Sequence, residues 1–178
     1  SGKTTPIRIF FKAIKSSDDT IIGGVGIVED FTERKRAEQQ IKYHATYDFL
    51  TGLPNRRLLL YQLNNEIARA RRHNHHGALL FIDLDNFKTI NDSLGHSVGD
   101  KLLKLVAARI KEFIRQEDSA ARMGGDEFTI ILTHLNTAAE PAANKAREIA
   151  EELSLCLSNP CRIESQTLHI TPSVGVSL

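Results

Sequence analysis

The sequence has 178 residues and contains no tryptophan, one methionine and two cysteines. The cysteines are Cys156 and Cys161, and their spacing matches neither a zinc-binding motif nor a redox motif. No secretory signal peptide is recognisable in the sequence. These absences argue against a secreted scaffold held by disulfides, and we expect a reducing, cytoplasmic setting.

A charge imbalance and a long apolar run are also missing. The formal net charge is +1, with 41% hydrophobic and 25% charged residues, which is ordinary for a soluble globular protein. A nearly neutral chain gives no argument for a nucleic acid or an anionic membrane as partner. No apolar run approaches the ~20 residues needed to span a bilayer. We therefore expect no nucleic acid partner and no membrane contact in this segment, so a membrane anchor of the native protein would lie outside it.

Two acidic motifs stand out against this background. The stretch Ala121–Phe128 contains Gly-Gly-Asp-Glu and precedes the apolar run Thr129–Leu132, which predicts a tight β-hairpin with acids at its tip. Paired glycines tolerate positive φ and allow another molecule to approach the backbone closely. Upstream, the apolar strand Leu79–Ile82 runs into Asp83 and Asp85. Two strands that end in acids, placed side by side, would form a cation site for phosphate chemistry.

The first part of the chain reads as a hairpin followed by a helix. Strands are expected at Ile7–Ile14 and Thr20–Val28, and a helix with Thr32 as its N-cap. The stretch Gly26–Glu38 resembles the end of a PAS sensor domain, where the last strand runs into a signalling helix. Helically spaced apolar residues in this helix fit a parallel dimeric coil, and a solvated linker helix fits equally well. These residues are Ala37, Ile41 and Ala45.

The rest of the chain alternates helical and extended patterns. A helix restarts at Asn55, and the histidines that end it at positions 73, 75 and 76 are interpreted as a solvated turn without function. The other expected elements are a strand at Ala78–Ile82, a short helix at Phe87–Asp92, a loop at Leu94–Asp100, a long helix carrying Leu102 to Ile114, a helix from about Pro141 to Leu157, and a final pair of strands at Cys161–Glu164 and Leu168–Leu178.

Residue chemistry alone nominates a site. Asp83 ends an otherwise apolar strand, where an unpaired carboxylate would be costly without a cation or hydrogen bonds. Asp126 is the natural second ligand, and the Lys88 ammonium could reach a phosphate. Asn91 and Asp100 offer an amide and a carboxylate, a pair that can read the edge of guanine. Taken singly, each residue could be a cap or a turn former, but their clustering at two strand ends weakens that alternative.

Four motifs together resemble the GGDEF family of diguanylate cyclases. They are Asp48-x-Leu50-Thr51-Gly52-Leu53-Pro54-Asn55-Arg56, Phe81-Ile82-Asp83-Leu84-Asp85-x-Phe87-Lys88-x-Ile90-Asn91-Asp92, Gly95-His96-x-x-Gly99-Asp100 and Arg122-x-Gly124-Gly125-Asp126-Glu127-Phe128. The resemblance implies an α+β fold, with a palm-like, ferredoxin-like antiparallel sheet flanked by helices, and condensation of two GTP molecules into cyclic di-GMP. It divides the chain into a PAS-like hairpin (1–31), a linker helix (32–46) and a GGDEF domain (47–178).

The resemblance also assigns roles. It implies Mg²⁺ or Mn²⁺ as the cofactor and a homodimer in which each domain supplies half a site. The metal would be bound by Asp83, the Leu84 carbonyl, Asp126 and Glu127. Catalysis would involve Asp126, Glu127 and Lys88, and GTP would contact Phe87, Asn91, His96, Asp100, Gly124 and Gly125.

A further motif resembles the family's inhibitory product site. Arg115-x-x-Asp118 lies five residues before the Gly-Gly pair, the spacing of a site that binds cyclic di-GMP. Arg147 is a candidate additional contact. The alternative is a surface ion pair at a helix end.

The sequence ends at Ser173–Leu178, where family members continue into a helix whose basic residues clamp phosphates. We expect the native chain to continue, with a cyclic di-GMP phosphodiesterase domain of the EAL type as one candidate, and this segment alone to bind GTP poorly. The alternative function is a non-catalytic module that binds GTP or cyclic di-GMP. The intact pair of acids in Gly124–Phe128 favours the enzyme.

Overall fold

The computed structural model describes residues 7–178, except the side chains of residues 36–39 and 42. The chain divides into two units, one ending at Ala45 and the other spanning Thr46–Leu178. This division falls beside the predicted boundary at residue 46. Residues 1–6 of the predicted PAS-like segment lie outside the described residues, and assignment of the first unit to a PAS domain stays a prediction.

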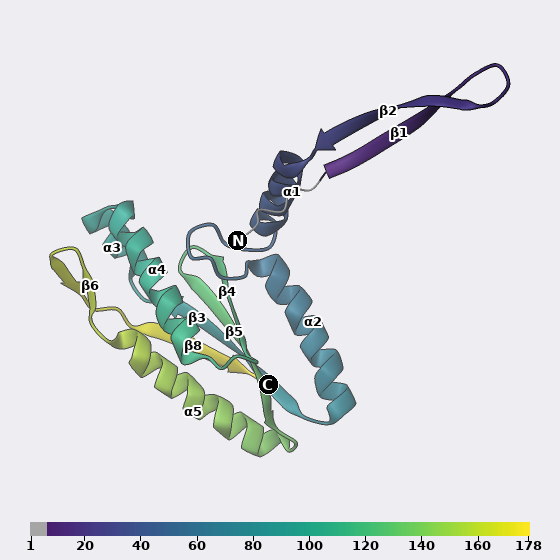
Figure 1. Cartoon of the computed structure of the whole chain (residues 1–178). Coiled ribbons are helices and arrows are strands. Elements are labelled where there is room, and N and C mark those ends of the chain that lie inside the picture. The colour runs from purple at the N-terminus through teal and green to yellow at the C-terminus, as the bar shows by residue number, and fades with distance from the viewer. Residues whose placement is uncertain (1–6) are drawn as a thin grey trace. The chain divides into compact units, whose positions relative to one another are not determined.

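The first unit contains an antiparallel hairpin of β1 (Ile7–Lys15) and β2 (Ile21–Asp30). Both strands lie where the sequence predicted them (Figure 1). The strands bury no side chain, and large apolar residues such as Phe11 and Val28 are 73% and 64% exposed. The hairpin therefore has no hydrophobic core of its own within the described residues, and hairpins of this kind are marginally stable alone.

Helix α1 (Thr32–His44) follows the hairpin. The prediction that Thr32 is its N-cap is wrong, because Phe31 occupies that position and Thr32 is the first helical residue. The Asp30 carboxylate takes over the capping role and accepts hydrogen bonds from the Thr32 backbone N–H (2.9 Å) and hydroxyl (2.6 Å). Ile41 is 69% exposed, whereas the Ala37 side chain lies outside the described residues, so the dimeric coil stays a prediction.

The second unit is built on a four-stranded antiparallel sheet in the order β4-β5-β3-β8. The strands are β3 (His76–Leu84), β4 (Ser119–Gly124), β5 (Glu127–Asn136) and β8 (Pro172–Ser177). The inner strand β5 is buried over six consecutive residues, because helices cover both of its faces. A continuous apolar run is the sequence pattern of such a strand.

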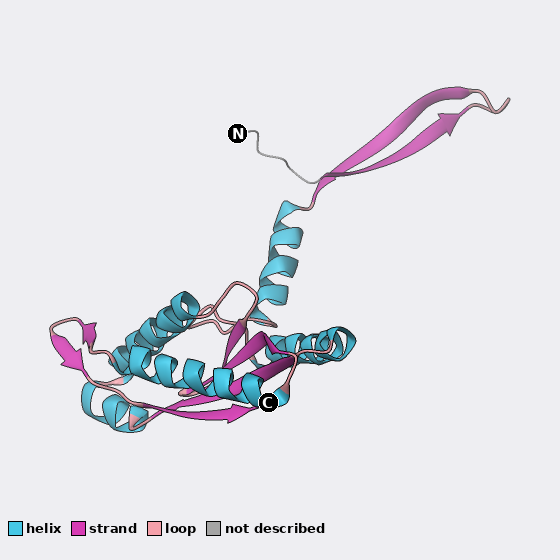
Figure 2. Cartoon of the chain, turned by 90° about the horizontal axis from the view of Figure 1, so that it is seen from below, coloured by secondary structure: helices cyan, strands magenta, loops and turns pink. Residues whose placement is uncertain are grey.

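Helices lie on both faces of this sheet (Figure 2). Helix α2 (Arg56–His73) packs over a small cluster of Leu59, Ala121 and Ile131 on one face. The opposite face holds the main core, covered by α4 (His96–Phe113) and α5 (Ala139–Ser158), with α3 (Phe87–Leu94) packed against α4. This arrangement is the predicted α+β fold. No helix in the part of the chain that the structure describes is long and apolar enough to cross a membrane.

The predicted loop at Leu94–Asp100 is largely helical instead. Helix α3 ends at Leu94 and α4 already begins at His96, so Gly95 alone separates them. Gly95 has φ 86°, a conformation that glycine adopts without strain and that redirects the chain between two helices. The glycine-rich composition of this stretch therefore marks one sharp corner, not a loop.

The prediction of one final pair of strands is also wrong, because three strands form and they pair differently. Strand β6 (Cys161–Ile163) pairs with β7 (Gln166–Leu168), whereas β8 pairs with β3. Glu164 has φ 56°, so the chain reverses immediately after β6 and forms a small separate hairpin. The sequence pattern alone did not separate β7 from β8.

The turn after α2 differs from the predicted solvated turn. Asn74 ends the helix in the left-handed conformation, with φ 50°, and the His75 backbone N–H returns a hydrogen bond to the Ala70 carbonyl at 3.1 Å. This reversal folds the His75 side chain inward, so that only 7% of it is exposed. The prediction was therefore wrong for His75, whereas His73 is exposed as expected.

Candidate active site

The β4–β5 turn forms as the sequence predicted. Gly124 pairs with Glu127, so Gly125 and Asp126 form a two-residue turn between the strands. Gly124 has φ 147° and Gly125 has φ 52°, and the first of these values is essentially restricted to glycine. The paired glycines thus place Asp126 and Glu127 at the end of the sheet.

Asp83 lies directly across from Glu127 in the register of β3 and β5, and Ser173 of β8 lies on its other side. Its neighbours Ile82 and Leu84 are buried, whereas Asp83 is exposed, because successive side chains of a strand point to opposite faces. The Asp83 side chain therefore lies outside the main core, although the strand that it ends is apolar as the sequence indicates. Its surroundings are other carboxylates and the apolar side chains of a cleft.

The carboxylates interact electrostatically. The pKa of Asp83 is raised above its ordinary value by desolvation and by the negative charges of Asp126, Glu127 and Asp85. A bound cation would reverse these repulsions, so the ionised form of Asp83 and a divalent ion would stabilise each other. The mutual repulsion of these carboxylates therefore favours a bound cation at this end of the sheet.

Leu84, the last residue of β3, and Asp85, in the turn after it, differ from Asp83 in their surroundings. Leu84 is 1% exposed, so only its backbone carbonyl could bind a metal. The Asp85 carboxylate accepts hydrogen bonds from the hydroxyls of Thr171 (2.7 Å) and Ser173 (2.8 Å), which lower its pKa. Asp85 is thus tied to the segment that leads into β8, and Asp83 is left to face Glu127.

A cleft of about 550 Å³ lies beside these carboxylates. Asp83 and Glu127 line it together with apolar side chains, including Phe81, which is 51% exposed. Strand β3 presents Phe81 and Asp83 on the sheet face opposite the main core, on the same side as α2. The cleft is within the volume range of small-molecule sites, and its acids lie at its edge.

The acidic group is open rather than cage-like. Within residues 7–178, Asp83, Asp126 and Glu127 do not bring one donor atom each to within 4.8 Å of the others. Mg²⁺ is usually held by one or two carboxylates, and phosphate oxygens and waters complete its octahedron. The residues present therefore fit a magnesium or manganese ion that arrives with a phosphate ligand.

The helical corner α3–α4 carries the other predicted substrate residues. Lys88, His96 and Asp100 are exposed. The Asn91 side-chain oxygen is buried and makes no hydrogen bond within the described residues. It packs against Gly99, where an added Cβ would lie only 1.9 Å from it.

Phe87 differs from the other predicted substrate residues. It is only 8% exposed and belongs to the main core. Its ring also lies 3.2 Å from the position that a Cβ on Gly99 would take. The structure therefore gives Phe87 a packing role beside Asn91, and a direct contact with substrate stays a prediction.

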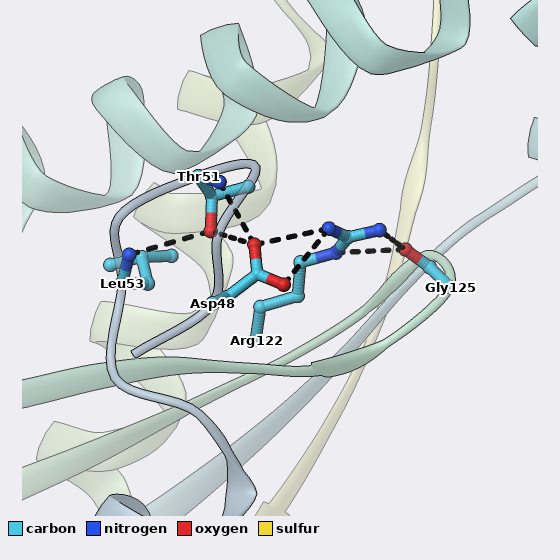
Figure 3. Close-up of polar contacts among 5 residues, drawn as sticks. All are labelled: Asp48, Thr51, Leu53, Arg122 and Gly125. Carbon is cyan, nitrogen blue, oxygen red and sulfur yellow. Dashed lines mark hydrogen bonds and ion pairs between the residues drawn. The ribbon is translucent and has the colours of Figure 1, made fainter. Parts of the chain in front are cut away.

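A buried polar network supports the Gly-Gly turn (Figure 3). Arg122 donates from Nε (3.0 Å) and Nη2 (2.7 Å) to the Gly125 carbonyl, and from Nη1 (3.1 Å) to the Asp48 carboxylate. The Arg122 and Asp48 side chains are 10% and 16% exposed. Thr51 holds Asp48 through its backbone N–H (2.9 Å) and hydroxyl (2.6 Å). The loop before α2 thereby fixes the turn that carries Asp126.

This network was not assigned a function from the sequence, although Asp48, Thr51 and Arg122 belong to the matching motifs. Burial by itself raises the pKa of Asp48, but hydrogen bonds from Thr51 and Arg122 outweigh it and hold that pKa below its ordinary value. Asp48 is therefore a charged partner for Arg122 at neutral pH. The available signal was that both partners belong to glycine-containing motifs far apart in the chain.

The predicted inhibitory residues lie at the other end of β4. The Asp118 carboxylate accepts hydrogen bonds from the backbone N–H of Thr133 (2.9 Å) and of Arg115 (3.3 Å). Arg115 and Asp118 line a cavity of about 130 Å³, and the α5 cation in its wall is Lys145. Arg147 is exposed and, among the described residues, is not part of that wall.

Residues 45–178 match the family described as diguanylate cyclase, GGDEF domain. The chain is 42% identical over 147 residues to the bifunctional diguanylate cyclase/cyclic di-GMP phosphodiesterase MucR of Pseudomonas aeruginosa, which covers 83% of this chain and 21% of MucR. The chain spans about a fifth of the length of MucR and of similar curated relatives.

Two solved structures from Caulobacter crescentus have similar folds. A sensory box/GGDEF family protein has a TM-score of 0.68 and 38% identity, covering 74% of this chain and 82% of its own. The coiled coil and GGDEF domain of DgcB, in complex with c-di-GMP, has a TM-score of 0.64 and 33% identity, covering 81% and 75%. The family match includes the sheet, the Gly-Gly turn and all three carboxylates.

Proposed function

The chain belongs to the GGDEF domain family of diguanylate cyclases, and on that premise we propose that it condenses two GTP molecules into cyclic di-GMP and releases pyrophosphate. The observation that carries this proposal is the placement of Asp83 opposite Glu127, with Asp126 in the adjoining glycine turn. Three carboxylates at one sheet end, beside an open cleft, suit metal-assisted phosphoryl transfer.

The reaction joins two nucleotides symmetrically. The 3′-oxygen of each GTP attacks the α-phosphorus of the other, a new P–O bond forms, and the bond to the leaving pyrophosphate breaks. A divalent ion held by Asp83, Asp126 and the Leu84 carbonyl would activate the hydroxyl and offset the phosphate charge. Asp126 or Glu127 accepts the proton of the 3′-hydroxyl. Lys88 balances the negative charge on the phosphates.

The α3–α4 corner supplies base recognition in this proposal. Asn91 and Asp100 read the guanine edge, with His96 close to the nucleotide. The buried Asn91 oxygen, which has no hydrogen-bond partner in the described structure, supports this role, because rotation of the amide toward a ligand would satisfy it. The Gly124–Gly125 backbone allows the nucleotide to approach the turn.

Catalysis requires two copies of the domain. Each copy holds one GTP, and the open cleft of one faces that of the other, so that each 3′-hydroxyl reaches the opposite α-phosphorus. The openness of the acidic group supports this, since one copy leaves the metal and nucleotide incompletely surrounded. Helix α1 and the preceding hairpin would set the geometry of the homodimer.

A direct assay separates the enzyme from the alternative binding module. The protein is incubated with GTP and Mg²⁺ or Mn²⁺, and products are separated by chromatography while GTP binding is measured by calorimetry. Cyclic di-GMP and pyrophosphate in a 1:2 ratio are expected from this stoichiometry. GTP binding without product, at protein concentrations high enough for dimers, would instead favour a non-catalytic module.

Gly99→Ala tests the proposed guanine site. The new Cβ would meet the Asn91 oxygen at 1.9 Å, so that the amide must leave its position. We expect KM for GTP to rise about tenfold, the usual cost of losing one hydrogen bond to a buried polar group. Ser97→Ala, an exposed change in the same helix, serves as the matched control. An unchanged KM in Gly99→Ala, with the fold verified by circular dichroism, would remove Asn91 from the guanine site.

Inhibition by the product is proposed at the cavity of Arg115 and Asp118. Arg115 is exposed, and its hydrogen bonds to Asp118 use only the Arg115 backbone, so Arg115→Ala should leave the fold intact. We expect the concentration of cyclic di-GMP that halves activity to rise at least about tenfold, because a charge-assisted contact to phosphate is lost. Arg147→Ala is the comparison, with a smaller effect expected since Arg147 does not line the cavity. Equal inhibition of the wild type and Arg115→Ala would place the product elsewhere.

A further inference from the structure

We propose that Glu66, His75 and His134 form a second metal site, separate from the acidic one, that binds a divalent transition-metal ion such as Zn²⁺. These residues come from α2, from the turn that follows it and from β5. One donor atom of each lies within 4.8 Å of the other two, and among residues 7–178 no other His, Cys, Asp and Glu side chains form such a group. The cluster lies in the half of β5 away from Glu127.

Backbone geometry unrelated to side-chain pairing brings the three residues together. Asn74 reverses the chain at φ 50° and turns His75 back over α2. His134 also has a positive φ, 51°, at a point where the register between β3 and β5 shifts. A non-glycine residue in that conformation is uncommon and marks a position that the surrounding structure determines. The irregularity turns an imidazole toward the end of α2.

The hydrogen bonds of this cluster leave one ring nitrogen of His75 without a partner among the described residues. His75 Nε2 lies 3.1 Å from the Glu66 carboxylate, but its Nδ1 is buried without a hydrogen-bond partner in the described structure. His75 is 7% exposed and the Glu66 side chain 10%, so solvent does little to compensate. An unsatisfied ring nitrogen in such a place is costly. The His134 ring lies beside this pair, stacked on that of His75 at 4.0 Å and 26°, and rotation of the exposed His134 ring would aim its in-plane donor at a shared metal.

The three ligand groups indicate which metal ion would bind. Two imidazoles and one carboxylate suit Zn²⁺ and other first-row transition ions, whereas Mg²⁺ prefers oxygen ligands alone. Bonds of about 2.0–2.1 Å to zinc place tetrahedral ligands about 3.4 Å apart, so the donors must draw in from their present spacing. His134 is exposed and can move to do so, and its exposed side leaves room for a water as fourth ligand.

A competing cation is already close to Glu66. Arg69 Nη1 lies 3.4 Å from the second carboxylate oxygen, at the long limit of a hydrogen bond. The Arg69 side chain is 57% exposed, so it can turn into solvent when a metal takes the carboxylate. Occupancy would join α2 to β5 and thereby stabilise the packing of that helix on the sheet.

Zinc binding by the protein without an affinity tag tests the proposal. Metal is removed with a chelator, Mg²⁺ is added in excess to occupy the acidic site, and Zn²⁺ is titrated calorimetrically. One equivalent is expected, with a rise in melting temperature, and Co²⁺ should give the visible absorption of a tetrahedral site. We expect His134→Asn to weaken affinity at least about tenfold, the size of loss seen even for partners outside the ligand sphere.

The variants are chosen to keep the fold. Asparagine tolerates the left-handed conformation of position 134, so His134→Asn removes the imidazole without straining the backbone. His75→Ala should have the same effect on zinc, and His169→Asn, an exposed histidine outside the cluster, should have none. Absence of stoichiometric binding, or equal affinity in His134→Asn and His169→Asn, would overturn the proposal and leave Glu66 and His75 as a buried hydrogen-bonded pair.

Discussion

Replacing Asp83 with asparagine is expected to reduce the formation of cyclic di-GMP by about a thousandfold or more, with the fold retained. A metal ion supplies several kcal/mol of charge stabilisation in phosphoryl transfer, and each 1.36 kcal/mol corresponds to a factor of ten in rate. The asparagine amide is similar in size but carries no charge. Asp83 is exposed, so the exchange disturbs little packing. Steady-state turnover at saturating GTP measures the loss.

The matched control is Asp85→Asn, in the turn that directly follows the same strand. It removes one negative charge from the same region, yet the Asp85 carboxylate is held by Thr171 and Ser173, and we assign it no metal. We expect its effect on turnover to be at least an order of magnitude smaller than that of Asp83→Asn. Equal losses would mean that total charge, rather than a ligand at position 83, determines activity, and the metal assignment would be wrong.

Asp83→Asn should also change the concentration of metal ion that activity requires. Desolvation and the neighbouring negative charges raise the pKa of Asp83, and a cation bound at its carboxylate would offset both effects. In Asp83→Asn, the concentration of Mg²⁺ or Mn²⁺ needed for half-maximal residual activity should therefore rise. An unchanged metal requirement would contradict direct ligation.

Local sequence pattern was sufficient to predict the acidic centre. The pair of glycines required positive φ, and an apolar run ending in acids fixed the strand, so Asp83 and the turn were placed correctly without knowledge of the fold. What the pattern could not give was the face on which Asp83 lies. That depends on alternation across the sheet and on the extent to which α2 covers its outer side, which is a property of packing.

The Asp48–Arg122 pair also could not be predicted from local sequence pattern. The two residues are 74 positions apart, and nothing within either local window indicates that they meet. The His75 cluster was missed for a related reason, since a run of polar residues at a helix end is usually solvated, and only the left-handed Asn74 turns one histidine inward. The long-range Asp48–Arg122 contact and the reversal at Asn74 therefore escaped prediction, whereas the Gly124–Gly125 turn did not.

Arg122→Ala is expected to cost about 3–5 kcal/mol of unfolding free energy, because it leaves the largely buried Asp48 carboxylate without its cationic partner. Arg57→Ala, an exposed arginine on α2, is the control and should change stability by less than about 0.5 kcal/mol. A double variant that also carries Asp48→Asn should be more stable than Arg122→Ala alone, since the unpaired charge is then absent. Urea denaturation of the wild type, of the single variants Arg122→Ala, Asp48→Asn and Arg57→Ala, and of the double variant measures these differences. A double variant as unstable as the sum of its parts would contradict the pairing.

The pH dependence of stability gives the pair an independent signature. The folded-state pKa of Asp48 is depressed, so its contribution is fully present above the unfolded pKa and is lost as the pH falls below about 4. Asp48→Asn should therefore be less stable than wild type at neutral pH, with the difference narrowing in acid.

Arg122 also donates twice to the Gly125 carbonyl, so Arg122→Ala should lower kcat more than it raises KM, because the turn holding Asp126 is no longer fixed. If Arg122→Ala loses stability but keeps its kcat, Arg122 has only a structural role. If both stability and kcat fall, Arg122 positions the catalytic turn.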